Sequence, residues 1–465
     1  MAIAVSTAQT FRPPAPEPRS RPLGALGMIY TLWRHPLEIW SHAHFELPVL
    51  VGKTFLGVRA VINDPVAVRR VFLDNAANYR KDALQLRILR PGLGSGLLTA
   101  DGEAWRSQRR ALAPLFSPRQ VADFAPAMHR VAREAVARMR GRGARMRDVD
   151  ADMALITLQV LEQTLFSQGL ARDPSEFQRA VTKYFNTIGR LDPLDLVGAP
   201  QYIPRIGRLQ GRESLAFFAS AVDDIISARK RLIDSGAAAP TDLLTLLLRA
   251  LDPETGRGMS LEDVRANIVT FIGAGHETTA NAMTWTLYLL SQAPEWRARV
   301  EAEIDAHFDN ARDDDPTGDL PVTRAALEEA MRLYPPAATL SREAIGEDWL
   351  AGARIPAGAT VTIAPYLLHR HKRLWKDPDA FDPERFLGAN RENIDRYAYI
   401  PFGAGPRVCI GMAFALQEAV ILLAHLLQSF RFDLAPGHVV EPAQRITLRP
   451  RHGMRMIVRQ RRKDA

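Results

Sequence analysis

The feature that most constrains the fold is a run of helical periodicity without proline, from Ser260 to about Ser291. Ser260 followed by Asp263 fits a capping box at the start of a helix. About 30 residues with a rise of about 1.5 Å each form a rod of roughly 45 Å, which can cross a whole domain. The middle of this run is apolar, so most of the helix should be buried. We therefore expect a fold built around one long, buried helix.

The rest of the chain predicts a mainly α fold with small β-sheets. Helical periodicity dominates residues 118–332, and short β-branched stretches follow at 360–363 and 454–458. The chain has 465 residues, of which 47% are hydrophobic. It can therefore bury a large core.

Three polar or proline-rich segments define the expected domain organisation. Residues 235–240 and 313–319 predict surface loops between helices, because apolar periodic segments flank them closely. Residues 13–22 contain five prolines and cannot be helical. We expect residues 1–24 to be a flexible N-terminal segment and residues 25–465 to form a single domain.

Composition narrows the setting in which the protein works. One cysteine excludes an internal disulfide and suggests a reducing compartment. The first residues lack a basic region followed by an apolar stretch, so we expect no secretion signal. No window of 18 apolar residues is evident, so we expect a cytoplasmic protein without a transmembrane segment. The net charge of +8 favours an acidic protein partner over nucleic acid, because no Lys/Arg block is interleaved with aromatic residues.

The sole cysteine, Cys409, lies in a glycine-rich loop that runs from Phe402 to Gly411. An apolar stretch without proline follows over residues 412–430 and predicts a helix. A thiol at a helix N-terminus is favoured as a thiolate, and the glycines allow a flat cofactor to approach the backbone. A thiolate is a good axial ligand for haem iron. A buried cysteine acting as a small hydrophobe is the alternative, and the surrounding spacing disfavours it.

A second motif, residues 274–279, lies inside the long helix. Gly275 costs about 1 kcal/mol relative to alanine at mid-helix, so it needs a reason. Either another helix packs closely there, or Ala274 and Gly275 let a planar ligand lie against the helix. Glu277 and Thr278 place an acid beside an alcohol, which can form a short proton relay. His276 is expected to be a packed helix residue rather than a ligand.

Two further motifs could each belong to a functional site or to an ordinary helix surface. Glu329 and Arg332 form an i, i+3 pair on a predicted helix, and such a pair is usually a surface feature. Arg385, however, precedes the cysteine loop at about the right distance to supply a second arginine, so that these three residues would form a buried triad. Trp105 and Arg109 place two donors on one helix face, which suits carboxylates but also fits an ordinary amphipathic helix.

Several apparent motifs do not point to a site. Residues 92–96 and 52–54 resemble fragments of nucleotide loops but lack the required strand or glycine. His369 and His371 have no third ligand at metal spacing.

Taken together, the motifs resemble those of the cytochromes P450, the haem-thiolate monooxygenases. The cysteine loop matches the family pattern Phe-Gly-x-Gly-x-Arg-x-Cys-x-Gly at every position, and the other three motifs occur in the family's order. Trp105 stands where many bacterial members carry histidine. The resemblance implies a triangular prism with a long central helix over haem b.

The resemblance also implies roles for individual residues. Cys409 would be the axial ligand of the haem iron, and Glu277 with Thr278 would deliver protons. Glu329, Arg332 and Arg385 would form a structural triad. The remaining haem contacts would be Trp105, Arg109, Ala274, Arg342, Phe402, Arg407 and Gly411.

The function implied is hydroxylation of an apolar small molecule of fatty-acid, terpenoid or steroid type, with dioxygen. Electrons would come from a separate ferredoxin and its reductase, which Arg106, Arg110 and Arg407 could dock. Arg87 and Arg90 could hold a substrate carboxylate. A peroxygenase or isomerase that needs no electron donor is the alternative, and a non-catalytic haem sensor is a third hypothesis.

Overall fold

The computed structural model describes residues 10–21, 23–54, 57–141, 143–167, 192–200, 212–309 and 320–461, with a few separate residues between 177 and 205. The expected loop at 313–319 lies outside these residues. The loop at 235–240 does connect two helices, α11 and α12.

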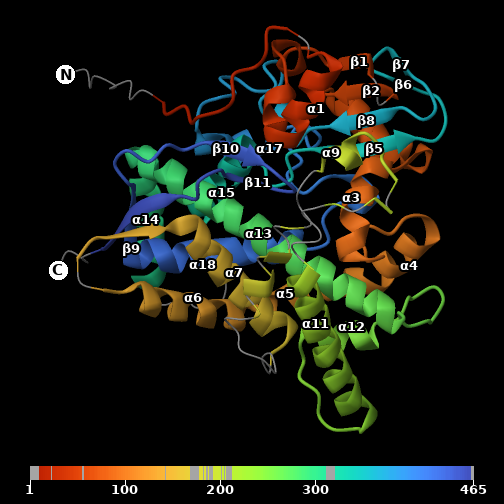
Figure 1. Cartoon of the computed structure of the whole chain (residues 1–465). Coiled ribbons are helices and arrows are strands. Elements are labelled where there is room, and N and C mark those ends of the chain that lie inside the picture. The colour runs from red at the N-terminus through yellow and green to blue at the C-terminus, as the bar shows by residue number, and fades with distance from the viewer. Residues whose placement is uncertain are drawn as a thin grey trace, which may run out of the picture.

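Helices make up most of the described chain and surround a long central one (Figure 1). In chain order the α-helices are α1 (Ala25–Arg34), α2 (Pro65–Arg69), α3 (Ala83–Leu93), α4 (Gly102–Leu112), α5 (Pro118–Ala122), α6 (Ala125–Met139), α7 (Val149–Leu165), α9 (Pro193–Leu196), α11 (Arg212–Asp234), α12 (Leu243–Arg249), α13 (Leu261–Gln292), α14 (Pro294–Asp309), α15 (Pro321–Leu333), α16 (Pro365–Leu368), α17 (Gly388–Glu392) and α18 (Met412–Ser429).

The predicted long helix is α13. The Ser260 side chain accepts a hydrogen bond from the Asp263 backbone N–H (3.0 Å), which satisfies one of the free donors at the helix start. α13 packs along α7 and also contacts α15 and α18, and all of its side chains from Ala280 to Leu290 are buried. The expectation of a buried central helix is confirmed.

The strands of the described residues form four small sheets. The largest has the order β1-β2-β8-β5-β3, in which only β2 and β8 are parallel. A three-stranded sheet, β4-β12-β9, and the hairpins β10-β11 and β6-β7 complete the set. The strands are β1 (Val49–Thr54), β2 (Gly57–Ile62), β3 (Tyr79–Lys81), β4 (Arg145–Asp148), β5 (Leu340–Ala344), β6 (Asp348–Leu350), β7 (Ala353–Ile355), β8 (Thr360–Ile363), β9 (Phe430–Leu434), β10 (Pro442–Gln444), β11 (Leu448–Pro450) and β12 (Arg455–Gln460).

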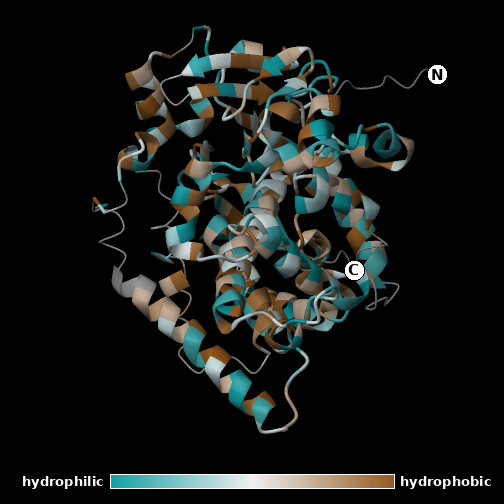
Figure 2. Cartoon of the chain, turned by 90° about the vertical axis from the view of Figure 1, so that its right-hand side faces the viewer, coloured by the Kyte–Doolittle hydropathy of each residue, from teal (hydrophilic) through white to brown (hydrophobic). Residues whose placement is uncertain are grey.

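The outer helix α11 differs in hydropathy from the buried helices. Figure 2 shows α11 projecting at the lower end with teal and brown residues alternating along it, as expected of an amphipathic surface helix.

Among the described residues, α18 alone has the length and composition to cross a membrane, although no apolar window of that length was expected. It packs against α6, α13, α14 and α15 and is mostly buried, so it is a core helix.

The described part of the N-terminal segment, residues 10–21, is not helical, as predicted, but it is attached to the rest of the chain. The Tyr334 hydroxyl donates to the Pro14 carbonyl (2.6 Å), the Phe381 N–H to the Phe11 carbonyl (2.9 Å), and the Arg19 N–H to the Trp40 carbonyl (2.9 Å). Residues 10–21 therefore lie against the domain rather than forming a detached segment. The division at residue 24 stays a prediction.

Candidate active site

A cavity of about 400 Å³ lies between the middle of α13 and the cysteine loop. Ala274 is exposed to this space although the helix around it is largely buried. A Cβ added to Gly275 would lie 3.0 Å from the Leu161 side chain of α7. Close packing of α7 against α13 therefore explains Gly275, while Ala274 provides the small wall that a flat ligand requires.

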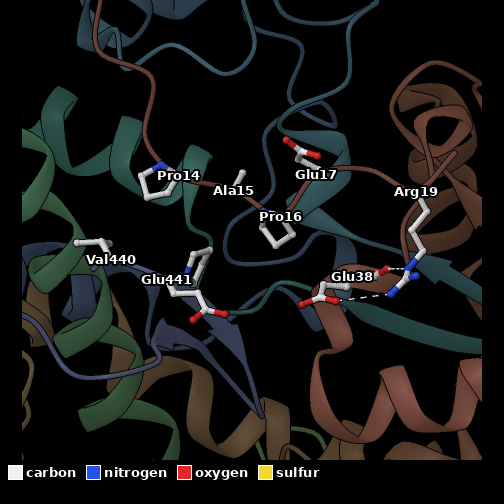
Figure 3. A pocket seen from close by; sticks show the side chains of 9 residues that line it. Pro14, Ala15, Pro16, Glu17, Arg19, Glu38, Val440 and Glu441 are labelled. Atoms are coloured by element: carbon white, nitrogen blue, oxygen red, sulfur yellow. Dashed lines mark hydrogen bonds and ion pairs between the residues drawn. The ribbon is translucent and has the colours of Figure 1, made fainter. Parts of the chain in front are cut away.

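A second hollow of about 400 Å³ is lined by residues 14–17 and by Val440, Glu441 and Pro442 (Figure 3). It contains an ion pair between Arg19 and Glu38 (3.5 Å). Its lining holds carboxylates and prolines but no thiol, so the chemistry indicated by the sequence is confined to the first cavity.

The cysteine loop is shaped by two glycines in left-handed conformations, Gly403 (φ 73°) and Gly405 (φ 68°). Any side chain at Gly405 would overlap the Phe72 carbonyl. The Cys409 N–H donates to the Phe402 carbonyl (2.8 Å), which closes the loop. Cys409 faces the cavity, and Gly411 and the start of α18 follow it directly.

The Cys409 thiol is exposed to the cavity, but protein surrounds that cavity on most sides. Burial raises the thiol pKa above its ordinary value, while the Gly411 N–H and the charge of Arg109 lower it. Burial is the largest of these effects. A bound cation would counter it by stabilising the charge of a thiolate.

Basic side chains gather where β3, β5 and the cysteine loop meet the cavity. Burial, followed by the charge of Arg407, lowers the pKa of Arg342 to about 10. Burial and the charges of Arg342 and Arg407 lower the pKa of Lys81 to about 7. Asp101 forms an ion pair with Arg407. One carboxylate does not balance this group of cations, so the site favours a ligand that carries carboxylates.

Trp105 and Arg109 lie at the same end of the cavity. The Arg407 guanidinium stacks over the Trp105 ring (4.1 Å to the centroid), and Arg109 Nη1 donates to the Val408 carbonyl (3.0 Å). Arg109 thus supports the cysteine loop as well as lining the cavity. Lys81 was missed, because only the pairing of β3 with β5 brings it opposite Arg342.

The acid and the alcohol of α13 both line the cavity, but they are not bonded to each other. The Thr278 hydroxyl donates to the Ala274 carbonyl (2.6 Å). Glu277 Oε1 accepts from the Thr447 hydroxyl (2.7 Å) and lies 3.4 Å from Arg449 Nη1. The side chains of the predicted relay therefore point to different partners in this structure.

A further acid at the cavity was not predicted. Glu418 of α18 is completely buried and lines the cavity beside Thr279. Burial raises the pKa of Glu418 well above its ordinary range, and the neighbouring Thr279 hydroxyl lowers it only in part. A single carboxyl inside the apolar run 412–430 was the sequence signal that could have identified it.

Glu329, Arg332 and Arg385 come together as expected. Arg332 donates to both Glu329 oxygens (2.6 and 2.8 Å), and both side chains are 0% exposed. Arg385 Nε lies 3.6 Å from Glu329 Oε1. His369 packs nearby and accepts from the Ile400 N–H (2.9 Å). Burial, followed by the charge of Arg332, lowers the pKa of His369 to about 3, so it stays neutral.

The other histidine, His371, lies near the Leu47 carbonyl (3.3 Å). No group of three His, Cys, Asp or Glu side chains suited to a metal ion occurs in the part of the chain that the structure describes.

Two expectations about arginines are not supported. Arg110 pairs with Asp252 (2.8 Å) and Arg106 with Glu103 (3.1 Å), so neither is a free surface cation. Arg87 donates to the Ala199 carbonyl (2.7 Å). Neither Arg87 nor Arg90 lines the cavity, so they do not stand where a substrate carboxylate would reach them.

Comparison with known proteins decides the family. The sequence matches the Cytochrome P450 family over residues 51–456. The chain is a cytochrome P450. It is 33% identical over 434 residues to cyclooctat-9-en-7-ol 5-monooxygenase of Streptomyces melanosporofaciens, covering 90% of each protein. It is 29% identical over 415 residues to 11-oxo-beta-amyrin 30-oxidase of Glycyrrhiza uralensis, covering 86% of this chain and 78% of that protein.

The fold agrees with this assignment. The crystal structure of the cytochrome P450DA heme domain aligns with a TM-score of 0.80 and 27% identity, over 97% of this chain and 98% of that one. The predicted mainly α fold with small sheets is therefore confirmed. The protein is a haem-dependent monooxygenase, and its cofactor is haem b.

Proposed function

We propose that this cytochrome P450 hydroxylates an apolar small molecule of terpenoid type in the cytoplasm, with electrons from a separate ferredoxin and ferredoxin reductase. The observation that carries the substrate class is the apolar wall of the cavity. The apolar side chains on this wall include Leu89, Leu93, Leu97, Leu98, Phe116 and Phe271. Two relatives named for oxidation of cyclooctat-9-en-7-ol and 11-oxo-beta-amyrin support the same class.

A fatty acid is less well supported than a terpenoid. Its carboxylate would need a cation away from the reacting end of the chain. Among the described residues of the lining, the cations are Lys81, Arg109, Arg342 and Arg407, and they gather at the cysteine-loop end.

The residues of the cavity fit haem b. Cys409 would hold the iron, while Arg342, Arg407 and Lys81 supply positive charge for the two propionates. Ala274 leaves room for the ring on the α13 side. Bound haem supplies activation of dioxygen and insertion of one oxygen atom into a C–H bond.

The protein's own contribution to the reaction is proton supply and exclusion of water. Thr278 Oγ1 would give its proton into the cavity and take one from the carboxyl group of Glu277, which is refilled from solvent. For this transfer Glu277 must leave Thr447 and turn toward Thr278. The apolar wall keeps other water away from the substrate.

The acid Glu277 and the alcohol Thr278 at the cavity also help to decide between a monooxygenase and the alternative function, a peroxygenase or isomerase. A peroxygenase or isomerase needs no proton relay for dioxygen, so Glu277 and Thr278 favour the monooxygenase with an electron donor. The net charge of +8 supports an acidic donor such as a ferredoxin.

The test uses purified holoenzyme with limonene and, separately, dodecanoic acid as probes. We expect limonene to shift the ferric haem spectrum and to be hydroxylated with NADPH, a bacterial ferredoxin and its reductase. T278A should form less product and more hydrogen peroxide per NADPH. Spectral binding of dodecanoic acid alone would contradict the substrate class, and product with hydrogen peroxide but none with the redox partners would favour the peroxygenase.

A further inference from the structure

A buried carboxylate outside the cavity holds both ends of one short turn. Asp348, on β6, has a side chain that is only 2% exposed. Its Oδ1 accepts two hydrogen bonds from the Arg70 guanidinium (2.7 and 2.8 Å). Its Oδ2 accepts one from Asn75 Nδ2 (3.0 Å) and one from the Tyr79 hydroxyl (2.8 Å). Arg70 begins the π-helical turn η3 (Arg70–Asp74) and Asn75 follows it, so one carboxylate fastens the turn at both ends.

Asp348 carries its charge at neutral pH. Burial raises its pKa, but the hydrogen bonds from Arg70, Asn75 and Tyr79 outweigh burial and lower the pKa to about 2. A charged acceptor forms stronger hydrogen bonds than a neutral one. Because π-helical turns are rare, an external contact of this strength is a physical reason for the turn at residues 70–74.

The turn places Phe72 at the cysteine-loop end of the cavity. Phe72 is buried and lines the cavity. Its backbone carbonyl packs so closely against Gly405 that no side chain fits there. The guanidinium carbon of Arg342 lies 5.1 Å from the centroid of the Phe72 ring, within the range of a cation–π contact. Phe72 therefore touches both the loop that carries Cys409 and a cation of the cavity.

We propose that Asp348 is a positioning residue for the haem site, which fixes the turn at residues 70–75 so that Phe72 supports the cysteine loop and Arg342. Asp348 does not line the cavity, so it acts through the turn. Without its charge the turn relaxes, and Phe72 loses its close packing against Gly405 and Arg342. This role does not depend on the substrate or the electron donor proposed above.

A purely structural role for Asp348 is the alternative. Tyr79 belongs to β3, so the same carboxylate also joins β6 to the five-stranded sheet. Loss of that link would lower the free energy of unfolding but would leave the haem site unchanged. The two roles therefore differ in how firmly haem is retained and in the reduction potential of its iron.

Transfer of haem from the ferric holoenzyme to excess apomyoglobin measures retention without turnover. D348N should lose haem severalfold faster than the wild type, because the cysteine loop loses support. Its reduction potential should also fall, because a nearby cation favours the reduced iron and Arg342 is held less firmly. D152N is the matched control, since Asp152 accepts two hydrogen bonds from Arg147 (both 2.6 Å) and does not line the cavity. D152N should leave both values unchanged.

A double-mutant cycle tests whether the effect passes through Phe72. F72A alone should lose haem faster than the wild type, and the double variant D348N/F72A should lose it no faster than F72A. If D348N does not accumulate, N75A removes one hydrogen bond of Asp348 and should give a smaller change in the same direction. The proposal is overturned by wild-type haem retention and potential in D348N, or in N75A where it is used instead. It is also overturned if the two single effects multiply in the double variant, or if D152N loses haem as fast as D348N.

Discussion

Removing one partner of the buried ion pair between Glu329 and Arg332 should destabilise the fold strongly, because both side chains are 0% exposed. Arg332 donates five hydrogen bonds: two to Glu329 and one each to the carbonyls of His369, Pro378 and Ala380, at 2.6 to 2.9 Å. R332Q removes the charge and leaves the Glu329 carboxylate buried. Removing one partner of a buried pair costs about 3–5 kcal/mol in the free energy of unfolding.

A matched exposed pair separates this effect from the loss of any arginine. Arg354 and Glu347 are also 2.6 Å apart, but their side chains are 63% and 47% exposed. R354Q should therefore cost only about 0–1 kcal/mol. Urea unfolding of the holoenzyme, followed by tryptophan fluorescence, measures both variants. If R332Q does not accumulate, R332K can replace it. R332K keeps the charge, so its loss in free energy of unfolding should lie between those of R332Q and R354Q.

If R332Q and R354Q lower the free energy of unfolding by amounts that differ by less than about 0.5 kcal/mol, this prediction is refuted. That result would mean that burial does not govern the contribution of this pair. A large loss in R354Q alone would contradict it in the same way.

Two other predictions concern pH and backbone conformation. Asp150 has a folded pKa of about 6 against an ordinary 3.8, so its contribution to stability is present below about pH 4 and lost as pH rises through 6. The free energy of unfolding of D150N relative to the wild type should therefore rise by up to about 3 kcal/mol between pH 4 and pH 8, as followed by thermal unfolding. An equal difference between the two proteins at both pH values would contradict this. G405A should lose haem content, because its Cβ would overlap the Phe72 carbonyl, whereas G437A has a similar φ of 75° in open space and should cost only about 1–2 kcal/mol. Equal haem content in the two variants would show that the overlap is unimportant.

Local sequence patterns were enough to predict the central elements. The run from Ser260 predicted α13 to within one residue, and the β-branched stretch at 360–363 coincides with β8. These features depend on neighbouring residues alone, so periodicity and capping determine them. The motif spacing around Cys409 then identified the family.

Contacts between distant strands and helices could not be predicted in this way. Arg449 and Thr447 reach Glu277 across about 170 residues of sequence, as their separations of 172 and 170 show. Lys81 meets Arg342 only through strand pairing. Side-chain direction in such places depends on the folded packing, which also explains why the Glu277 and Thr278 side chains are not joined.

The central claim is the bond between the Cys409 sulfur and the haem iron, and the carbon monoxide spectrum of the reduced enzyme tests it most directly. The wild type should show the band typical of thiolate-ligated haem, and C409S should lose that band while the protein stays folded. A wild type without the thiolate band, or a C409S variant that keeps it, would contradict the account.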